Sequence, residues 1–554
     1  MRFPMPLRVA LGGLAILLVA SPALAQSLLH ETFGPQDGAR LGTSVDGLDD
    51  VDGDGHADVL VGAYLADGVG AESGEVRVIS GADGSTLYTL GGDAAGDWFG
   101  YSVSCLGFVD FDNRRDFVVG APHGGYARVF SGADGSELTT IAGAFNSSYC
   151  VSDVGDVNAD GRDDIGVGTW DDSSVGTNNG VFRIYSGLDW SLMIEVFGNP
   201  WQRLGTSMTG LGDVDGDLHD DFAVGAIGLD GGLVQVFSGI DFSLMYELQG
   251  DEPGDMLGYS LAGGMDLDWD TLPDLVAGAP GHDAWAGYAR AYSGLTGAEI
   301  FTNYGEPSSS NGSSVGLMRV FVGDDQTYVL VGAETADRDD HGILTQNAGR
   351  VRLLHGTTGD EAFVFEGREA AATFGASVAA AGDVDGDGFE DLVAGAPTTI
   401  VGGEAPGAAH VLSPQLRGSW SSTCAPLPNS AGGGANLSAQ GSASVFVNDL
   451  MLHATGLPPS VTVLAFYGPQ EIAAPFGDGT LCVGAPQYRY APVWTSGGSG
   501  LLTRHFDLTR QPAASGPGRV DGGESWHVQL WYRDVANGGA GFNTSSGLQV
   551  DFLP

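Results

Sequence analysis

The sequence contains no lysine, and all 22 of its basic side chains are arginine. The absence of a lysine amine excludes Schiff-base chemistry and phosphate-binding loops of the Walker type. Basic charge is scarce altogether, because 70 acidic side chains leave a formal net charge of −48. Nucleic acid needs a basic surface, so we expect no nucleic-acid partner.

Cysteine is also rare, with four residues in a chain of 554. No two of them form a C-x-x-C pair, which excludes zinc ribbons and thioredoxin-like redox motifs. Cys424 and Cys482 lie in the same C-terminal region and could pair in an oxidising compartment. A bridge between Cys105 and Cys150, which lie in neighbouring repeats, is less favoured but also open.

After residue 25 the sequence has no apolar run long enough to span a membrane. The first 25 residues combine Arg2 and Arg8 with an apolar stretch from Val9 to Ala20, and they end in Ala23-Leu24-Ala25. This order is typical of a secretory signal peptide, since a retained anchor helix would need a longer apolar run. We expect cleavage before Gln26 and a mature protein that is secreted or held at the cell surface.

Glycine and aspartate are abundant instead, with 91 glycines and an excess of aspartate among the acids, and both favour turns. They recur in seven copies of one pattern: a Phe-Gly or Leu-Gly start, an acidic loop, and a Gly-Ala or Gly-Ala-Pro end. The copies begin near residues 41, 99, 147, 204, 257, 311 and 374. Each copy reads as four short strands, which predicts an all-β fold with a seven-bladed β-propeller at residues 26–414.

The two ends of the repeat array predict how the propeller closes. The seventh copy stops after its third strand, at residues 408–412, and has no fourth. Residues 27–34 match the fourth-strand segment at residues 85–91 of the first copy. An open solenoid would leave both edges exposed, so we expect the mature N-terminus to complete the seventh blade and close the ring.

An acidic loop with the pattern D-x-[DN]-x-D-x-x-x-D lies between strands one and two of five blades. The predicted ligands are Asp50, Asp52, Asp54 and Asp58 in blade one; Asp156, Asn158, Asp160 and Asp164 in blade three; Asp213, Asp215, Asp217 and Asp221 in blade four; Asp266, Asp268, Asp270 and Asp274 in blade five; and Asp383, Asp385, Asp387 and Asp391 in blade seven. Alternating oxygens in a curled loop suit Ca²⁺, which takes six or more oxygen ligands. We therefore expect about five structural calcium ions.

Two other interpretations of these loops are weaker. A solvated acidic turn would not recur at the same place in five repeats, and an EF-hand needs an acid at position twelve, where the first loop has Val61. Blade two has Phe108 at position one, and Arg114 and Arg115 within the loop could replace the ion. Blade six keeps only Asp324, so we expect blades two and six to bind no metal.

The combination of these motifs in fixed order resembles the FG-GAP repeats of integrin α-subunit propellers. The resemblance implies calcium loops on one face and partner-binding loops on the other. It places recognition on the loops at residues 64–74, 170–179, 280–287 and 334–349. The implied function is a binding or adhesion module for an extracellular protein or glycan. We do not expect an integrin subunit, because the chain shows no inserted ligand-binding domain, stalk or membrane anchor.

Residues 415–554 leave the repeat and show alternating apolar runs typical of a small antiparallel β-sandwich. Their segment Cys424-Ala425-Pro426-Leu427-Pro428-Asn429-Ser430 resembles the start of a C-terminal module found on secreted bacterial repeat proteins. The resemblance implies surface retention or export sorting, and a purely structural cap is equally open. We expect three segments in all: a signal peptide (1–25), a propeller (26–414) and this module (415–554).

One motif could suggest an enzyme. Residues 312–316 read G-x-S-x-G, but a nucleophile elbow needs a helix after it, and this segment aligns with the first strand of every blade. We therefore expect no catalytic residue from this motif. The alternative function is a carbohydrate- or lipid-acting hydrolase or lyase with its site in the propeller channel.

Overall fold

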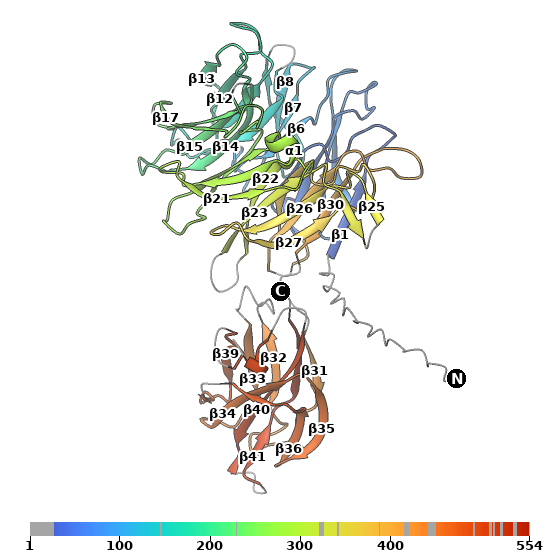
Figure 1. Ribbon diagram of the computed structural model, residues 1–554, viewed down its shortest axis with the longest axis vertical. Coiled ribbons are helices and arrows are strands. Elements are labelled where there is room, and N and C mark those ends of the chain that lie inside the picture. Colours follow the sequence, from blue (N-terminus) through green and yellow to red (C-terminus); the bar gives the residue numbers. More distant parts are fainter. Residues whose placement is uncertain are drawn as a thin grey trace, which may run out of the picture.

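A computed structural model shows an almost entirely β-stranded protein (Figure 1). It describes residues 27–143, 147–228, 230–320, 326–340, 343–386, 388–414, 420–440, 450–490, 493–508, 512–513, 516–520, 524–535 and 540–552. The predicted signal peptide lies outside these residues. Among them, the helical segments are α1 (His282–Trp285) and η1 (Gly516–Gly518), and neither has the length or the apolar character that a membrane-crossing helix needs.

The repeat region forms seven four-stranded antiparallel sheets, one for each sequence copy. Sheets one to three are β2 (Val45–Leu48), β3 (Asp58–Ala63), β4 (Glu75–Ile79) and β5 (Thr86–Gly91); β6 (Ser102–Cys105), β7 (Phe117–Ala121), β8 (Tyr126–Phe130) and β9 (Glu137–Ala142); and β10 (Cys150–Asp153), β11 (Ile165–Thr169), β12 (Val181–Tyr185) and β13 (Leu192–Phe197). Sheets four and five are β14 (Leu204–Gly212), β15 (Asp221–Ala226), β16 (Leu233–Phe237) and β17 (Leu244–Gln249); and β18 (Ser260–Met265), β19 (Asp274–Ala279), β20 (Tyr288–Tyr292) and β21 (Glu299–Tyr304).

Sheets six and seven depart slightly from this order. Sheet six is β22 (Asn311–Val320), β23 (Gln326–Ala333), β26 (Arg350–His355) and β27 (Glu361–Glu366), with the hairpin β24 (Arg338–Asp340) and β25 (Ile343–Thr345) inserted between its second and third strands. Sheet seven is β28 (Ser377–Gly382), β29 (Asp391–Ala396), β30 (Ala408–Ser413) and β1 (Ser27–Phe33).

The sheets form a closed ring. Each first strand touches the first strand of the next sheet, from β2 through β6, β10, β14, β18, β22 and β28 back to β2. Short parallel bridges join neighbouring sheets at the other end, for example Gly74 to Phe99 and Gly349 to Phe374, and the same bridge from Gly407 to Leu41 links sheet seven to sheet one. The predicted β-propeller is therefore confirmed.

The Phe-Gly and Gly-Ala motifs lie at the seams between sheets, where backbones meet. A Cβ atom at Gly62 in sheet one would collide with the carbonyl oxygen of Gly100 in sheet two, and Gly395 meets Gly42 in the same way. The serine two residues after the first glycine ties the same seam, since Ser260 Oγ donates to Gly312 O (3.0 Å). The repeat motif thus records the close approach of adjacent sheets.

Strand β1 completes sheet seven, as the sequence predicts. It pairs antiparallel with β30, from Ser27 opposite Ser413 to Phe33 opposite Ala408. Residues at the two ends of the repeat array therefore share one sheet, and the ring has no open edge at this point.

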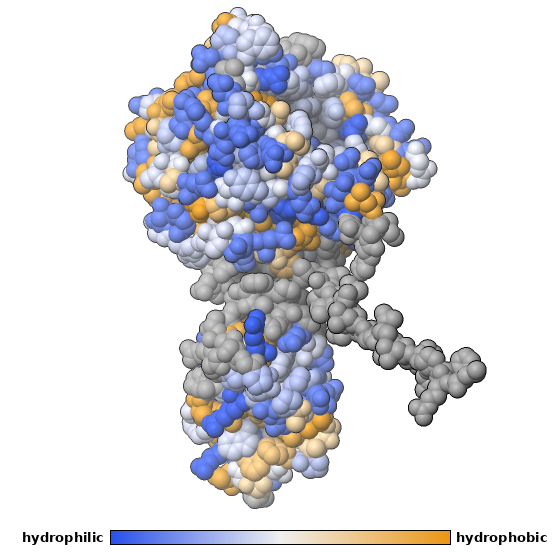
Figure 2. Space-filling model, in the orientation of Figure 1, coloured by the Kyte–Doolittle hydropathy of each residue, from blue (hydrophilic) through white to orange (hydrophobic). Residues whose placement is uncertain are grey.

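The interior of the ring is apolar, whereas the visible outer face of the molecule is largely hydrophilic with scattered hydrophobic residues (Figure 2). The second strand of each sheet is covered on both faces, and all six residues of β3, β15, β19 and β29 are buried. Clusters such as Val76, Phe99, Phe117 and Phe130 fill the space between neighbouring sheets. This packing fixes the loops at both ends of each strand.

After β30 the chain forms sheets of its own, drawn in orange and red in Figure 1. A seven-stranded sheet contains β31 (Trp420–Cys424), β42 (Gly547–Asp551), β40 (Ser525–Arg533), β34 (Thr462–Gly468), β37 (Tyr488–Arg489), β38 (Trp494–Thr495) and β41 (Phe542–Thr544); β32 (Asn436–Gln440), β33 (Met451–Thr455) and β39 (Leu502–His505) form a second sheet, and β35 (Glu471–Phe476) pairs with β36 (Gly479–Val483). One apolar core contains residues of the first two sheets, including Leu452, Tyr467 and Val528. Cys424 and Cys482 form a disulfide, while Cys105 and Cys150 are free thiols.

Candidate metal centre

Each acidic loop that the structure describes connects the first and second strands of a sheet, and the loops with an aspartate at position one share one hydrogen-bonding scheme. We number their positions one to nine from the first aspartate of the pattern. In sheet one, Asp50 at position one accepts backbone N–H groups from Gly53 (2.6 Å), Asp54 (3.1 Å) and Gly55 (2.9 Å). These bonds curl the chain around the carboxylate, as an oxygen-lined cation loop requires.

The aspartate at position nine anchors each loop in the core. Asp58 is fully buried and accepts N–H groups from Val51 (2.9 Å) and from Gly81 (3.0 Å), the glycine that follows strand three. Asp221 makes the same pair of bonds to Val214 and Gly239. The Ser-Gly that ends strand three in the repeat therefore serves the loop as well as the turn.

Burial changes the acidity of these anchoring aspartates. It raises the pKa of Asp58, Asp116, Asp221 and Asp274 to about 6 and that of Asp164 to about 7. The cause is loss of hydration, which disfavours the charged form and outweighs the backbone hydrogen bonds that favour it. A bound cation would favour the carboxylate instead.

The structure gathers three carboxylates in five of the loops. In each group the oxygens of positions one, three and nine (in sheet two, positions three, five and nine) lie within 4.8 Å of one another. The groups are Asp50, Asp52 and Asp58; Asp110, Asp112 and Asp116; Asp213, Asp215 and Asp221; Asp266, Asp268 and Asp274; and Asp383, Asp385 and Asp391. Like charges this close repel one another, and an all-oxygen donor set with one buried member fits a hard cation.

The position-five aspartates lie outside these groups in the loops that follow the full pattern. Asp54, Asp217 and Asp270 each accept the N–H of position seven instead, at 2.9 Å. Asp387, the predicted ligand at this position in sheet seven, lies outside the described residues.

The loop of sheet two differs from the prediction. Its aspartates converge like those of the other loops, although Phe108 occupies position one. Arg114 and Arg115 do not replace an ion there, because they extend to the loop of sheet one: Arg115 Nε lies 2.8 Å from Asp49 Oδ2, and Arg114 Nη1 donates to the carbonyl of Asp50. Blade two therefore has a carboxylate group like those of its sisters, and the expectation that it binds no metal stays a prediction.

The loop of sheet three keeps the backbone scheme but gathers fewer carboxylates. Asp160 N donates to Asp156 Oδ1 and to Asn158 Oδ1, both at 2.9 Å. The amide of Asn158 directs its Nδ2 toward Asp164 Oδ1 (3.4 Å), so a donor stands where the sister loops have an acceptor. Asp164 Oδ2 is buried without a hydrogen-bond partner among the described residues. In sheet six, residues 321–325 of the loop lie outside the described residues.

Contacts between neighbouring loops were not predicted from the sequence. His56 Nδ1 lies 2.7 Å from Val384 O, and His219 Nδ1 lies 2.8 Å from Val157 O. Arg114 and Arg162 make the equivalent contact with the carbonyls of Asp50 and Phe108. The recurrence of a basic residue at position seven was the available signal, and these contacts link four loops to the preceding sheet.

The loops at the opposite end of the sheets carry a row of aromatic rings. Strands alternate in direction, so the connections from strand two to three and from strand four to the next sheet lie away from the acidic loops. Trp98 stacks on His123 with ring centroids 3.5 Å apart, and Tyr64, Tyr101, Tyr149 and Trp170 continue the row at about 5.2 to 5.4 Å. The row overlaps the predicted recognition loops at residues 64–74 and 170–179.

The serine of the G-x-S-x-G segment has a structural partner. Ser314 lies within strand β22 and donates from Oγ to Gly375 O in sheet seven (2.8 Å). Ser377 makes the equivalent bond to Gly42 O (2.9 Å). Ser314 thus lies inside a continuous strand and not at a strand-to-helix turn, so the segment is not a nucleophile elbow.

Comparison with known proteins agrees with this architecture. A family model for the FG-GAP repeat matches residues 41–79 and 374–412, which are sheets one and seven. The chain therefore contains FG-GAP repeats, and its repeat region is integrin-α-like.

Three relatives illustrate the similarity. Integrin alpha-5 of Xenopus laevis is 34% identical over 216 residues, covering 34% of this chain and 20% of the relative. Integrin alpha-V of Gallus gallus is 33% identical over 183 residues (31% and 17%), and integrin alpha-PS2 of Drosophila melanogaster is 30% identical over 227 residues (34% and 15%). The matched segments thus span a fifth or less of each of these relatives.

Proposed function

We propose that this protein is an exported, calcium-stabilised binding or adhesion module that recognises an extracellular protein or glycan. The observation that carries the proposal is the repetition of a three-carboxylate group at the same place in five sheets of an integrin-α-like propeller. The disulfide between Cys424 and Cys482 suits an oxidising, extracellular setting. Under this proposal, residues 1–25 are the signal peptide, 26–414 the propeller, and 415–554 a module for surface retention, sorting or capping.

Calcium in this proposal is structural. Loops one, four, five and seven have both the sequence pattern and the converged carboxylates; loop two has the convergence alone, and loop three has the pattern alone. About five ions would bind, and each would neutralise carboxylates whose repulsion otherwise opposes folding. Because the groups resemble one another, no single loop is distinguished as a catalytic centre.

The test combines ion counting with ligand screening. Equilibrium dialysis of the mature protein should give about five calcium ions, and two or fewer would contradict the proposal. A glycan and matrix-protein array, run with calcium and with chelator, should show a ligand whose binding depends on calcium. The variants Asp110→Asn and Asn158→Asp locate the fifth ion. Loss of one bound calcium ion in Asp110→Asn would place it in sheet two, and tighter calcium binding in Asn158→Asp would place it in sheet three.

A second candidate function is a hydrolase or lyase with its site near the ring axis. Asp46 and Asp153 lie on the first strands of sheets one and three, and burial raises their pKa to about 6 and about 8. None of the six sister positions of Asp46 in the other sheets holds an ionisable side chain, and Cys105 is the one ionisable residue among the six sisters of Asp153. Asp153→Asn would abolish turnover of a carbohydrate or lipid ester if this candidate were correct, and would leave calcium-dependent binding unchanged if it were not.

A further inference from the structure

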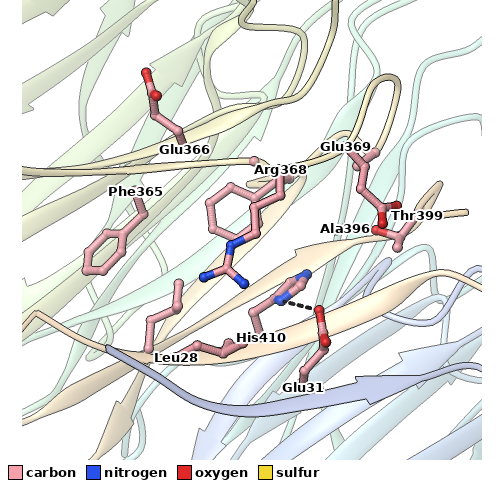
Figure 3. A pocket seen from close by; sticks show the side chains of 13 residues that line it. Leu28, Glu31, Phe365, Glu366, Arg368, Glu369, Ala396, Thr399 and His410 are labelled. Carbon is pink, nitrogen blue, oxygen red and sulfur yellow. Dashed lines mark ion pairs between the residues drawn. The ribbon is translucent and has the colours of Figure 1, made fainter. Parts of the chain in front are cut away.

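A cavity of about 230 Å³ lies at the seam between sheets six and seven, at the same end of the ring as the predicted recognition loops (Figure 3). Its walls come from β27, from the connection that follows it, and from β30 and β1. The N-terminal strand contributes Leu28 and Glu31, and the connection contributes Arg368 and Glu369. The cavity therefore exists only once the ring is closed.

At two sister seams an arginine and its acidic partners occupy the equivalent place. The middle residue of strand three is Arg128 in sheet two and Arg290 in sheet five. Arg290 binds Asp251 of the preceding connection with both terminal nitrogens, at 3.0 and 2.6 Å, and its Nε lies 3.6 Å from Glu299 of strand four. Arg128 pairs with Asp93 and Glu137 in the same way.

The seam before sheet seven reverses this arrangement. His410 takes the arginine position, and Arg368 takes the position of Asp93 and Asp251, so the two groups cannot form the sister ion pair. Two further positions are smaller: Ala372 stands for the buried Asp97 and Asp255, and Ala408 for Tyr126 and Tyr288. These smaller side chains open the cavity.

The Arg368 guanidinium points into this cavity, between Phe365, Leu28 and His410 (Figure 3). It has no ion pair or hydrogen bond with any residue that the structure describes, although the chain carries a net charge of −48. Glu366 is engaged by Arg350 (3.0 Å), and Glu369 accepts the N–H of Ile400 (3.3 Å). An arginine without a partner beside apolar walls is a site for a carboxylate.

The other polar groups identify what carries that carboxylate. Glu31 Oε1 lies 3.4 Å from His410 Nδ1, and burial together with the nearby Arg368 lowers the pKa of His410 to about 4. The imidazole is then neutral, so it does not neutralise Glu31, whose carboxylate oxygens can accept hydrogen bonds from a ligand. A purely aliphatic acid or an acidic peptide side chain would bring only repulsion to Glu31, whereas hydroxyl groups can donate to it.

We propose that this cavity binds the terminal sugar of an acidic glycan, a uronic-acid type residue whose carboxylate pairs with Arg368 and whose hydroxyls donate to Glu31 and Glu369. Phe365, Phe374 and Leu412 offer the apolar walls against which the C–H face of a pyranose ring packs. The volume is below that of sites for drug-sized ligands, which fits a single sugar unit rather than a chain. This inference rests on the binding function proposed above and names its ligand class.

The test is isothermal titration of the mature, calcium-loaded protein with a short oligouronate, with its neutral methyl ester, and with an aspartate-rich peptide. The oligouronate should bind, and the ester and the peptide should bind at least about tenfold more weakly, since one charge-assisted pair contributes roughly a tenfold to hundredfold effect. Equal binding of the ester, stronger binding of the peptide, or no binding of any oligouronate overturns the proposal.

Three variants locate the site. Arg368→Gln should abolish oligouronate binding, and His410→Arg should do so by restoring the sister ion pair with Glu31 while preserving the fold. Arg203→Gln is the matched control, because Arg203 lies over Trp170 in the aromatic row (5.2 Å) and should leave this binding unchanged. Loss with Arg203→Gln alone would move the site to the aromatic row. Calcium-dependent melting is measured on each variant, so failure of this site and failure of the proposed module are distinguished.

Discussion

Replacing Asp215 by alanine should destabilise the propeller in calcium and should leave it equally stable or more stable in chelator. Asp215 is an exposed member of the group with Asp213 and Asp221, whose oxygens lie within 4.8 Å. Within the loop, the Asp215 carboxylate accepts one described hydrogen bond, from Asp217 N at 3.2 Å. Removal therefore costs little local structure and takes away two repulsive pairs, each worth about 1 kcal/mol at the dielectric constant of water.

The effect of Asp215→Ala on the free energy of unfolding therefore depends on whether calcium is present. With free calcium a hundredfold above its dissociation constant, an intact site stabilises the folded state by about 2.7 kcal/mol, and the variant loses most of this. In chelator only the repulsion term remains, so the variant should be as stable as the parent or up to about 2 kcal/mol more stable. For a chain of this size we expect the melting temperature to fall by a few degrees in calcium.

The assay is thermal unfolding followed by circular dichroism, in calcium and in chelator. Asp241→Ala is the matched control: Asp241 is exposed in the same sheet, accepts Ser243 N (2.9 Å), and belongs to none of the carboxylate groups. Its effect should be equal in the two buffers. If Asp215→Ala destabilises equally in both, or if chelator leaves the parent unchanged, the interpretation of the loops as calcium sites is refuted.

Four further predictions follow from the same structure. Asp385→Ala should lower the melting temperature in calcium more than Asp215→Ala, because sheet seven also holds the ring closed. Equal shifts would show that calcium binding in sheet seven does not contribute to ring closure. N-terminal sequencing of exported protein should find Gln26 first, and a truncation that begins at Gly34 should be cut rapidly by protease within sheet seven, since β30 loses its partner. Ser314→Ala and Ser377→Ala should each lower the free energy of unfolding, measured in urea, by about 1 kcal/mol. Replacing a catalytic serine would instead abolish turnover without changing this free energy. Acidification from pH 6.5 toward 4 should destabilise the parent more than His410→Gln. The folded-state pKa of His410, about 4, lies below its unfolded value, so the unfolded chain takes up the proton first and the free energy of unfolding falls by at most about 3 kcal/mol. Identical pH profiles of the two proteins would refute this.

Much of the fold is predictable from the sequence because the same contacts between neighbouring sheets require the same residue types in each repeat. Gly62 and Ser260 have to be small or hydroxylated where neighbouring backbones meet. The glycine recurs in all seven copies and the serine in six, with Cys150 in the third. The closing strand is predictable for a related reason, since a missing fourth strand at one end and an extra one at the other can pair only in one sheet.

The site is less predictable, because its geometry depends on contacts between copies. A pattern that requires an acid at position one misses the loop of sheet two, where burial of Asp116 and its bonds to Val109 and Gly132 suffice to fold the chain. The same pattern cannot tell whether Asn158 presents oxygen or nitrogen to its neighbours. The cavity beside Arg368 could not be predicted for another reason: it exists because Ala372 is smaller than the aspartates at its sister positions and His410 replaces an ion-paired arginine.

The pairing of β1 with β30 also sets the order of events during biogenesis. Residues 27–33 leave the ribosome early, yet their partner strand ends at Ser413, so nearly 400 residues must be synthesised before the last sheet can form. Until then the leading segment carries unpaired backbone groups next to six sheets that can already fold locally. Ring closure is thus a late step, which follows synthesis of the whole repeat region. Any factor that holds the leading segment, or any protease that trims it, controls whether the finished protein becomes a ring.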